Sequence, residues 1–422
     1  MSKLKQILAF VKANLILLLS VVVMVAALPT GLLLGMSKAA AIHKQVEQDL
    51  QQRLRSLNGA QTNYALPDLL GAGQTEFSRP PNKATNEAVA RYMQAAAKAA
   101  DEVYRWAVQW NSEDRPLLVE GLFPEPKPEE AARKLQEVAA AWPAAQRALL
   151  REFGAGAPPD PEVVLARLET RKEEWVQRAV DRGEEAEQAA ADPDLRRALT
   201  ELRHRLYVDR AQSLTFYASD DVFVAVAPWS SERPPSLDVA WDWQHRTWMH
   251  RDILKALALA NTDQAGVRLS VLDGPVKRIE SIAVAPWTYE GTSQPRPINP
   301  AAPVPLNFEA SFTGLAGPNP LFDVRYATIS VIVDSARIPE VLDAFAATNL
   351  MTVIDQRIES YDPAQDLAEG YVYGLSSPVR LQLRIETLWM RQWTAPLMPP
   401  KVRAALGVPS PQPAQQRQGA GS

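Results

Sequence analysis

The chain has 422 residues, a length that could hold about two or three domains, and its 46% hydrophobic content is ample for packed cores. Its 45 basic and 49 acidic residues give a net charge of −4, which gives no electrostatic support for nucleic-acid binding, and no nucleic-acid partner is expected. The chain has no cysteine, which excludes disulfides, thiolate nucleophiles and cysteine-ligated metal or iron–sulfur sites.

The first predicted element is an apolar segment, with no charged residue between Lys12 and Lys38. As a helix, residues 15–36 are long enough to cross a hydrocarbon core of roughly 30 Å and to contact membrane lipid. The apolar core of a cleaved signal peptide is usually only about 7–15 residues, so an uncleaved anchor is favoured. Residues 1–37 are therefore expected to be a cytoplasmic tail and transmembrane anchor in the inner (cytoplasmic) membrane. The bulk of the chain is then periplasmic or extracytoplasmic.

Two mainly helical regions follow the span. From Ile42 to Leu57, apolar residues recur every three or four positions, which predicts an amphipathic helix. It is either a coiled-coil stalk or a simple juxtamembrane helix, because about three to four heptads are needed to tell the two apart. This helix and the polar linker that follows it make up the predicted region 38–83. Residues 84–210, rich in Ala, Glu, Arg, Leu and Gln, predict a helical domain of about four helices, one of them starting at Asp160–Pro161.

Strand patterns begin near residue 211. Apolar and polar residues alternate in PVRLQLRIETLW, which predicts a half-buried strand. Similar runs are LTFYA, DVFVAVA, VKRIESIAVA, LNFEASF, YATISVIVD and MTVIDQRIES. Helices on one face of an antiparallel sheet would make an α+β sandwich over residues 211–395. Residues 396–422 lack periodicity and are predicted to be a disordered tail.

Two helices are predicted within this region. The first covers about Val239 to Asn261. The second covers about Ile338 to Thr348, with Pro339 near its start and Asn349 at its end.

The segment WDWQHRTWMHRD lies in the first of these helices and raises the question of a binding site. His245 and His250 are five positions apart, about 140° around a helix, so they are poorly placed to bind one metal ion. Asp242 and Arg246 are spaced for a salt bridge one turn apart. Farther along, Met249, Ile253, Ala256, Leu257 and Ala260 form an apolar stripe that is expected to face the core.

The remaining aromatic residues of this segment allow two interpretations. Trp241 and Trp248, with His245, form either core or sheet-edge packing, which is favoured, or a partner-binding surface.

Motifs for catalysis are missing from the sequence. It contains no GxGxxG, GxxxxGK[ST] or GxSxG pattern and no EF-hand loop. Asp220 and Asp221 could bind a cation or serve as acid and base, but adjacent acids before a strand more often form a solvated turn. No catalytic, metal or cofactor-binding residue is therefore assigned, and the protein is not expected to be an enzyme.

The order of a short tail, a single span, an exported helix and a module of strands and helices resembles the inner-membrane alignment proteins of type IV pilus and type II secretion machines, the PilO and GspM kind. The resemblance rests on residues 15–36, on residues 42–57 and on Val239–Trp389. It implies a ferredoxin-like sandwich that forms homodimers or pairs with sister subunits and has no catalytic residues. The long helical block and a proline-rich segment at residues 295–305 depart from that family.

These observations favour a non-catalytic scaffold of a bacterial envelope assembly, acting as a homodimer or in a hetero-oligomer with other envelope proteins. The alternative is an anchored ligand-binding or sensor module that uses the Trp241/Trp248 region. A third hypothesis, an exported hydrolase, depends on Asp220 and Asp221 alone.

Overall fold

The computed structural model describes residues 3–59, 62–66, 75–79, 82–224, 234–285, 287–288, 304–305 and 321–409. Contacts divide the chain into two compact units, Met1–Tyr104 and Arg105–Ser422. Most of the predicted helical domain thus belongs to the same unit as the sheet. The predicted strand LNFEASF and residues 410–422 lie outside the described residues.

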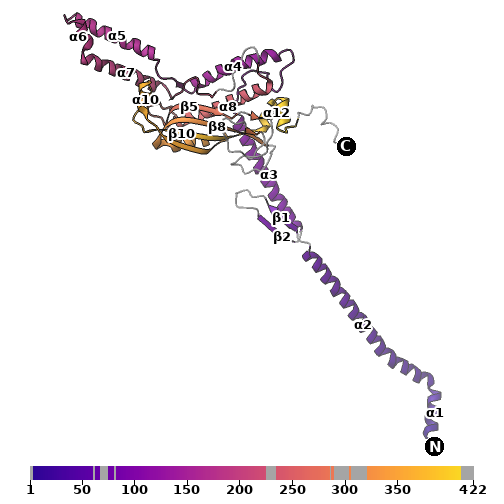
Figure 1. Cartoon of the computed structure of the whole chain (residues 1–422). Coiled ribbons are helices and arrows are strands. Elements are labelled where there is room, and N and C mark those ends of the chain that lie inside the picture. The colour runs from indigo at the N-terminus through magenta and orange to yellow at the C-terminus, as the bar shows by residue number, and fades with distance from the viewer. Residues whose placement is uncertain are drawn as a thin grey trace. The chain divides into compact units, whose positions relative to one another are not determined.

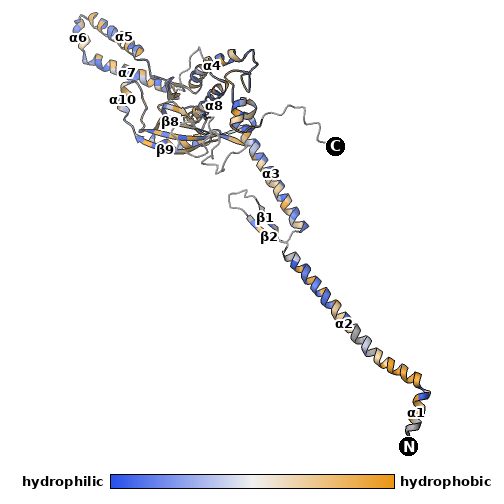
Figure 2. Cartoon of the chain, turned by 45° about the vertical axis from the view of Figure 1, so that its right-hand side comes forward, coloured by the Kyte–Doolittle hydropathy of each residue, from blue (hydrophilic) through white to orange (hydrophobic). Residues whose placement is uncertain are grey.

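The first unit begins with α1 (Lys3–Ala13) and α2 (Leu15–Gly59), which Asn14 separates. Helix α2 continues from the apolar segment into the predicted amphipathic helix and includes Pro29. Its apolar part is long enough to span a membrane, as the sequence predicts. Figure 2 shows the change along α2 from hydrophobic residues near α1 to hydrophilic residues near Gly59.

A small hairpin follows α2, where the sequence predicts only a linker. Strands β1 (Thr62–Leu66) and β2 (Thr75–Arg79) pair antiparallel. The rings of Tyr64 and Phe77 stack with centroids 5.0 Å apart, and the Tyr64 hydroxyl donates a hydrogen bond to Asn86 Oδ1 at 2.6 Å. Asn86 lies in the next helix, α3 (Lys83–Ser112). The linker prediction is therefore wrong for these ten residues. Their polar composition suggested a linker, but an aromatic pair across the two strands stabilises the hairpin.

In the described part of the second unit, four helices lie between α3 and β4 (Phe216–Tyr217), and the short strand β3 (Ala155–Gly156) separates the first of them from the others. The four helices are α4 (Ala131–Glu152), α5 (Pro161–Val180), α6 (Ala186–Ala191) and α7 (Pro193–Ser213). The predicted start at Asp160 is confirmed, because its side chain accepts a hydrogen bond from the backbone N–H of Glu162 at 2.8 Å. Helices α5 and α7 lie side by side, with α6 between them at the tip (Figure 1).

The described residues place six strands in the main sheet, in the order β3-β4-β5-β8-β10-β9. They are β3 (Ala155–Gly156), β4 (Phe216–Tyr217), β5 (Val276–Val284), β8 (Phe322–Asp334), β9 (Met351–Ser360) and β10 (Pro378–Met390). The four long strands are antiparallel, as predicted, but β3 and β4 run parallel to their neighbours. The sheet is therefore mixed, because the connections through α5–α7 and α8 are long enough for parallel crossovers. Strands β6 (Trp287–Thr288) and β7 (Val304–Pro305) form a separate parallel pair.

Helices α8 (Leu237–Ala260) and α9 (Ile338–Ala346) contact each other and cover one face of the sheet. Both match the sequence prediction to within about two residues. The elements follow the order α8, β5, β8, α9, β9, β10. Helix α4 packs against α8, so α8 has neighbours on two sides (Figure 1). The main core lies between the sheet and these helices, and the predicted stripe of α8 is buried in it.

This unit also contains short helices. They are η1 (Ser335–Arg337), α10 (Pro363–Ala368), α11 (Arg391–Thr394), η2 (Ala395–Leu397) and α12 (Pro400–Ala405). Met398, Val402 and Leu406 are buried in the main core. The prediction of a disordered tail is therefore wrong for residues 396–409. Three apolar side chains spaced four residues apart lie on one side of a short helix, and their burial stabilises it.

Candidate interaction site

The aromatic residues that the sequence singles out lie in the core. Trp241 and Trp248 are 0% exposed and His245 is 1% exposed. The two indoles pack edge to face with centroids 5.8 Å apart, and the His245 ring lies 4.3 Å from that of Trp389. Another tryptophan of α8, Trp243, stacks on Trp142 of α4. The interpretation of Trp241, His245 and Trp248 as an interaction surface is wrong for this fold, and the sensor hypothesis loses the residues that it used.

The polar residues of α8 are buried with them and form ion pairs. Arg246 Nε lies 2.6 Å from Asp242 Oδ2, which confirms the predicted salt bridge, and Arg325 of β8 lies 2.9 Å from the other oxygen of Asp242. Burial opposes the charged carboxylate, but the two guanidinium groups hold the pKa of Asp242 below its usual value. Burial, together with Arg325 and Arg115, lowers the pKa of His245 well below its usual value.

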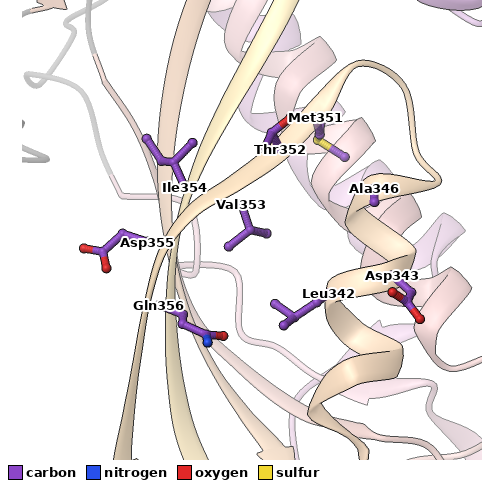
Figure 3. Close-up of a pocket in the computed structure, with 9 residues that line it drawn as sticks. All are labelled: Leu342, Asp343, Ala346, Met351, Thr352, Val353, Ile354, Asp355 and Gln356. Atoms are coloured by element: carbon purple, nitrogen blue, oxygen red, sulfur yellow. The ribbon is translucent and has the colours of Figure 1, made fainter. Parts of the chain in front are cut away.

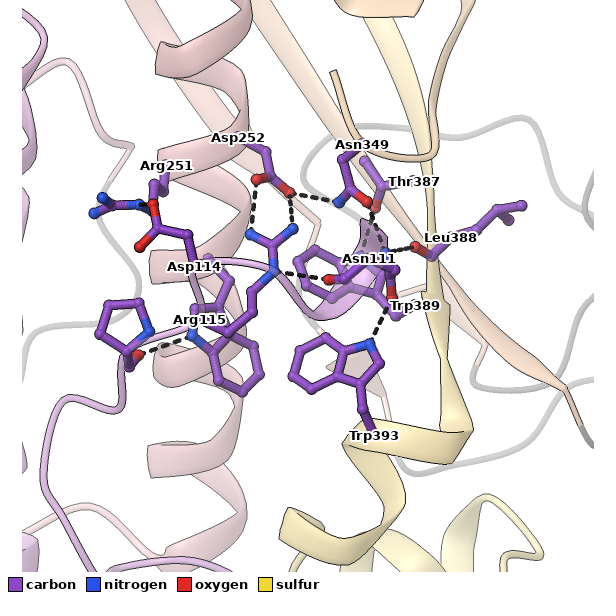
Figure 4. Close-up of polar contacts among 12 residues, drawn as sticks. Asn111, Asp114, Arg115, Arg251, Asp252, Asn349, Thr387, Leu388, Trp389 and Trp393 are labelled. Carbon is purple, nitrogen blue, oxygen red and sulfur yellow. Dashed lines mark hydrogen bonds and ion pairs between the residues drawn. The ribbon is translucent and has the colours of Figure 1, made fainter. Parts of the chain in front are cut away.

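A second buried network joins the end of α3 to the sheet (Figure 4). The Asn111 amide donates to Asn349 Oδ1 at 2.8 Å and to the Leu388 carbonyl at 2.9 Å. Its oxygen accepts hydrogen bonds from the backbone N–H of Met390 at 2.8 Å and from the indole of Trp393 at 2.7 Å. Asn111 is 0% exposed, and these four bonds use both N–H donors of its side-chain amide and both acceptor positions of the amide oxygen. This residue fastens the end of α3 to the sheet.

An ion pair extends the same network to α8. Arg115 donates to both oxygens of Asp252, at 2.7 and 3.0 Å, and Asn349 donates to Asp252 at 2.7 Å. The Arg115 and Asp252 side chains are only 6% and 5% exposed. Asn349 has a φ of 51°, a left-handed conformation that asparagine tolerates just beyond a helix end. The cavity beside these paired side chains has a volume of only about 20 Å³, which is too small for a substrate. The network is therefore structural.

The acidic residues at 220 and 221 lie where the turn interpretation expects them. Both are exposed in a turn, and the Ser219 hydroxyl donates a hydrogen bond to Asp221. Within the described part of the chain, no three His, Asp or Glu side chains gather as a metal site. A carboxylate that the sequence did not single out, Asp366, accepts hydrogen bonds from Tyr361 and Tyr373 and pairs with Arg278 at 3.1 Å. This cluster attaches α10 to the second face of the sheet.

The exposed feature with the clearest capacity for contact is the edge strand β9. It pairs with β10 on one side, and among the described residues the strand order of the sheet ends with it. An edge strand presents backbone N–H and C=O groups that can pair with another chain. Ile358 is 53% exposed, although it lies opposite Leu381, which is fully buried in β10. The pairing register of β9 with β10 changes between Arg384 and Ile385, and Ile354 of β9 forms a bulge there.

An open groove runs along this edge between α9 and β9 (Figure 3). Its volume is about 690 Å³. Leu342 and Ala346 of α9 line one side of the groove, and Val353 and Gln356 of β9 line the other. The sequence predicted both elements but did not predict that β9 ends the sheet. That depends on strand order, and the alternation of residues within a single strand contains no information about its neighbours.

Comparison of the chain with known proteins adds no further information on this site. No family model, curated protein or solved structure matches. The function therefore has to be inferred from the residues and contacts described above.

Proposed function

We propose that the protein is a single-pass, membrane-anchored scaffold of a bacterial envelope assembly rather than an enzyme. The observation that carries the proposal is α2, whose apolar part is long enough to span a membrane and continues directly into a polar helix. Three lysines precede the span and four basic residues follow it within about 20 residues, so the charges alone do not set its orientation. A short tail, one span and a large body are the layout of an inner-membrane anchor with an exported body. This is the layout of the alignment subunits of type IV pilus and type II secretion machines.

The body of the protein, in this proposal, is a variant of the ferredoxin-like fold. That fold has the element order β-α-β-β-α-β. The order α8, β5, β8, α9, β9, β10 is the same series with its first strand moved to the end, and the four strands are antiparallel neighbours. This arrangement supports the resemblance drawn from the sequence. The helices α4 to α7 remain an addition to it.

The contact that we assign to the scaffold is pairing of β9 with β9 of a second copy. Asp355 and Arg357 lie opposite Arg384 and Gln382 of β10, on the face of the sheet that α8 and α9 do not cover. In an antiparallel pair centred on Gln356, Asp355 of each copy is directly opposite Arg357 of the other. Opposite charges in that position stabilise strand pairing, and a two-fold axis gives the pair twice. Charge complementarity therefore favours a second copy as the occupant of this edge.

The scaffold proposal is tested by crosslinking in native membranes, purification of the full-length protein in detergent and mass spectrometry of the proteins recovered. Envelope-assembly subunits recovered at a fixed ratio, together with crosslinked pairs of this chain, are the expected result. A single uncrosslinked chain that carries a bound small molecule would overturn the proposal and favour a ligand-binding module.

A further inference from the structure

The helix that precedes the membrane span has most of its apolar residues on one side and two of its three lysines on another. On α1, Ile7, Leu8, Phe10 and Val11 fall within an arc of about 160° at 100° per residue. They are exposed by 59, 65, 67 and 37% respectively. Lys5 and Lys12 are seven positions apart, so by helical spacing they share a line on the helix, well away from the centre of that arc. Lys3, the first residue of the helix, falls within the arc instead. This distribution is typical of a helix that lies in a membrane surface rather than across the membrane.

The connection between α1 and α2 fits the same position. Asn14 separates the two helices, and its side chain donates a hydrogen bond to the Phe10 carbonyl at 3.2 Å. The apolar residues of α2 begin immediately afterwards, at Leu15. If α2 spans the bilayer, the end of α1 at Ala13 lies at the boundary between headgroups and acyl chains.

The charge of this segment indicates which surface it fits. Residues 1–37 contain three lysines and no acidic residue. A lysine near an anionic bilayer surface strengthens binding by about fivefold, so a lysine-rich helix prefers anionic over neutral headgroups. Lysine can also bury its hydrocarbon stem while its ammonium group stays in water.

We propose that α1 is an in-plane helix with Ile7, Phe10 and Val11 in the acyl-chain boundary and with Lys5 and Lys12 on anionic phospholipid headgroups. The inference rests on the proposed function in one respect, because it requires α2 to be inserted. It adds a second, lipid-selective attachment that holds the start of the span at a fixed depth. A span with a single flanking lysine would have a weaker preference between lipids.

The absence of cysteine allows a direct test on the full-length protein, because each introduced thiol is the only one. Phe10→Cys marks the apolar side, Ala9→Cys marks the basic side, and Val22→Cys within α2 marks the span. Each variant is labelled with a polarity-sensitive fluorophore and reconstituted in vesicles of phosphatidylcholine with about one third phosphatidylglycerol. Iodide is then added as a water-soluble quencher. Quenching several-fold stronger at residue 9 than at residue 10, with residue 22 protected, is the expected result.

Three other outcomes would overturn the inference in distinguishable ways. Equal quenching at residues 9 and 10 would mean that α1 projects into water. Equal protection at both would mean that α1 continues the span. Quenching at residue 22 would mean that α2 is not inserted, so that the anchor itself fails.

The lipid preference is tested separately with the label on Phe10→Cys. In neutral phosphatidylcholine vesicles, and in a Lys5→Gln, Lys12→Gln variant in anionic vesicles, quenching at residue 10 should rise. Replacing Lys38 and Lys44 by Gln removes the same charge from α2 and should leave the quenching unchanged. Equal quenching in both lipids, or an equal effect of the two double variants, would overturn the assignment to anionic headgroups.

Discussion

Reversal of one charge on β9 should weaken association between two copies of the chain. Asp355→Arg places arginine opposite Arg357 of the other copy, so two attractive pairs become two repulsive ones. Each cross-strand charge pair contributes roughly 0.2–1 kcal/mol. Arg357 is 74% exposed and already lies 3.0 Å from Glu359 of its own strand, which favours the lower half of this range. The total loss should be about 2 kcal/mol, or roughly a 30-fold weaker dimer.

The assay uses a disulfide across the proposed two-fold axis. Because the chain has no cysteine, Gln356→Cys introduces one thiol at the centre of the pair. Cα atoms directly opposite in an antiparallel pair are about 4.5–5.5 Å apart, which a disulfide can bridge. Mild oxidation of the full-length protein in membranes should therefore yield a covalent dimer. Ala265→Cys, exposed in a loop away from β9, is the matched control for random collision.

Charge reversal is then combined with the Gln356→Cys variant. Asp355→Arg and Arg357→Asp should each lower the dimer yield, and the double variant should restore it, because it exchanges the two charges without removing the pair. A yield no higher than that of the Ala265→Cys control, or a double variant no better than the single ones, would refute the proposed register.

Three predictions concern the stability of the second unit. They are tested by denaturant unfolding of the full-length protein in detergent, with tryptophan fluorescence as the signal. Asp252→Ala should cost about 3–5 kcal/mol, because it leaves Arg115 buried without its carboxylate; a cost below 1 kcal/mol would show that Arg115 reaches water. Burial, with a contribution from Arg246, lowers the pKa of His250 to about 3, whereas the unfolded value is near 6.5. The unfolded state thus binds the extra proton first, and stability should fall by up to about 1.4 kcal/mol per unit as the pH drops from 6.5 to 5; an unchanged slope in His250→Gln would contradict this. Met398→Ala should cost about 2–5 kcal/mol, while no loss would mean that residues beyond 395 do not join the core.

Local patterns were sufficient for most of the helices and strands. The predicted strand MTVIDQRIES coincides with β9, and the predicted cap at Asp160 is present. The apolar stripe of α8 is buried as expected. In each case the information lies within about ten neighbouring residues, because the helical and strand periods place apolar side chains on one side of the element. The apolar segment of α2 is also a local property, since its length and composition alone qualify it to span a membrane.

The tertiary structure decided how many sides of each element are covered. Periodicity identified one buried side of α8, but α4 covers another, and this places Trp241, His245 and Trp248 in the core. The strand order, which leaves β9 at the edge, and the pairing of Asp252 with Arg115 both join residues far apart in the chain. Such contacts depend on which elements become neighbours after folding. The sequence by itself therefore determined the elements and the apolar span, and only the packed structure decided which side chains remain available to a partner.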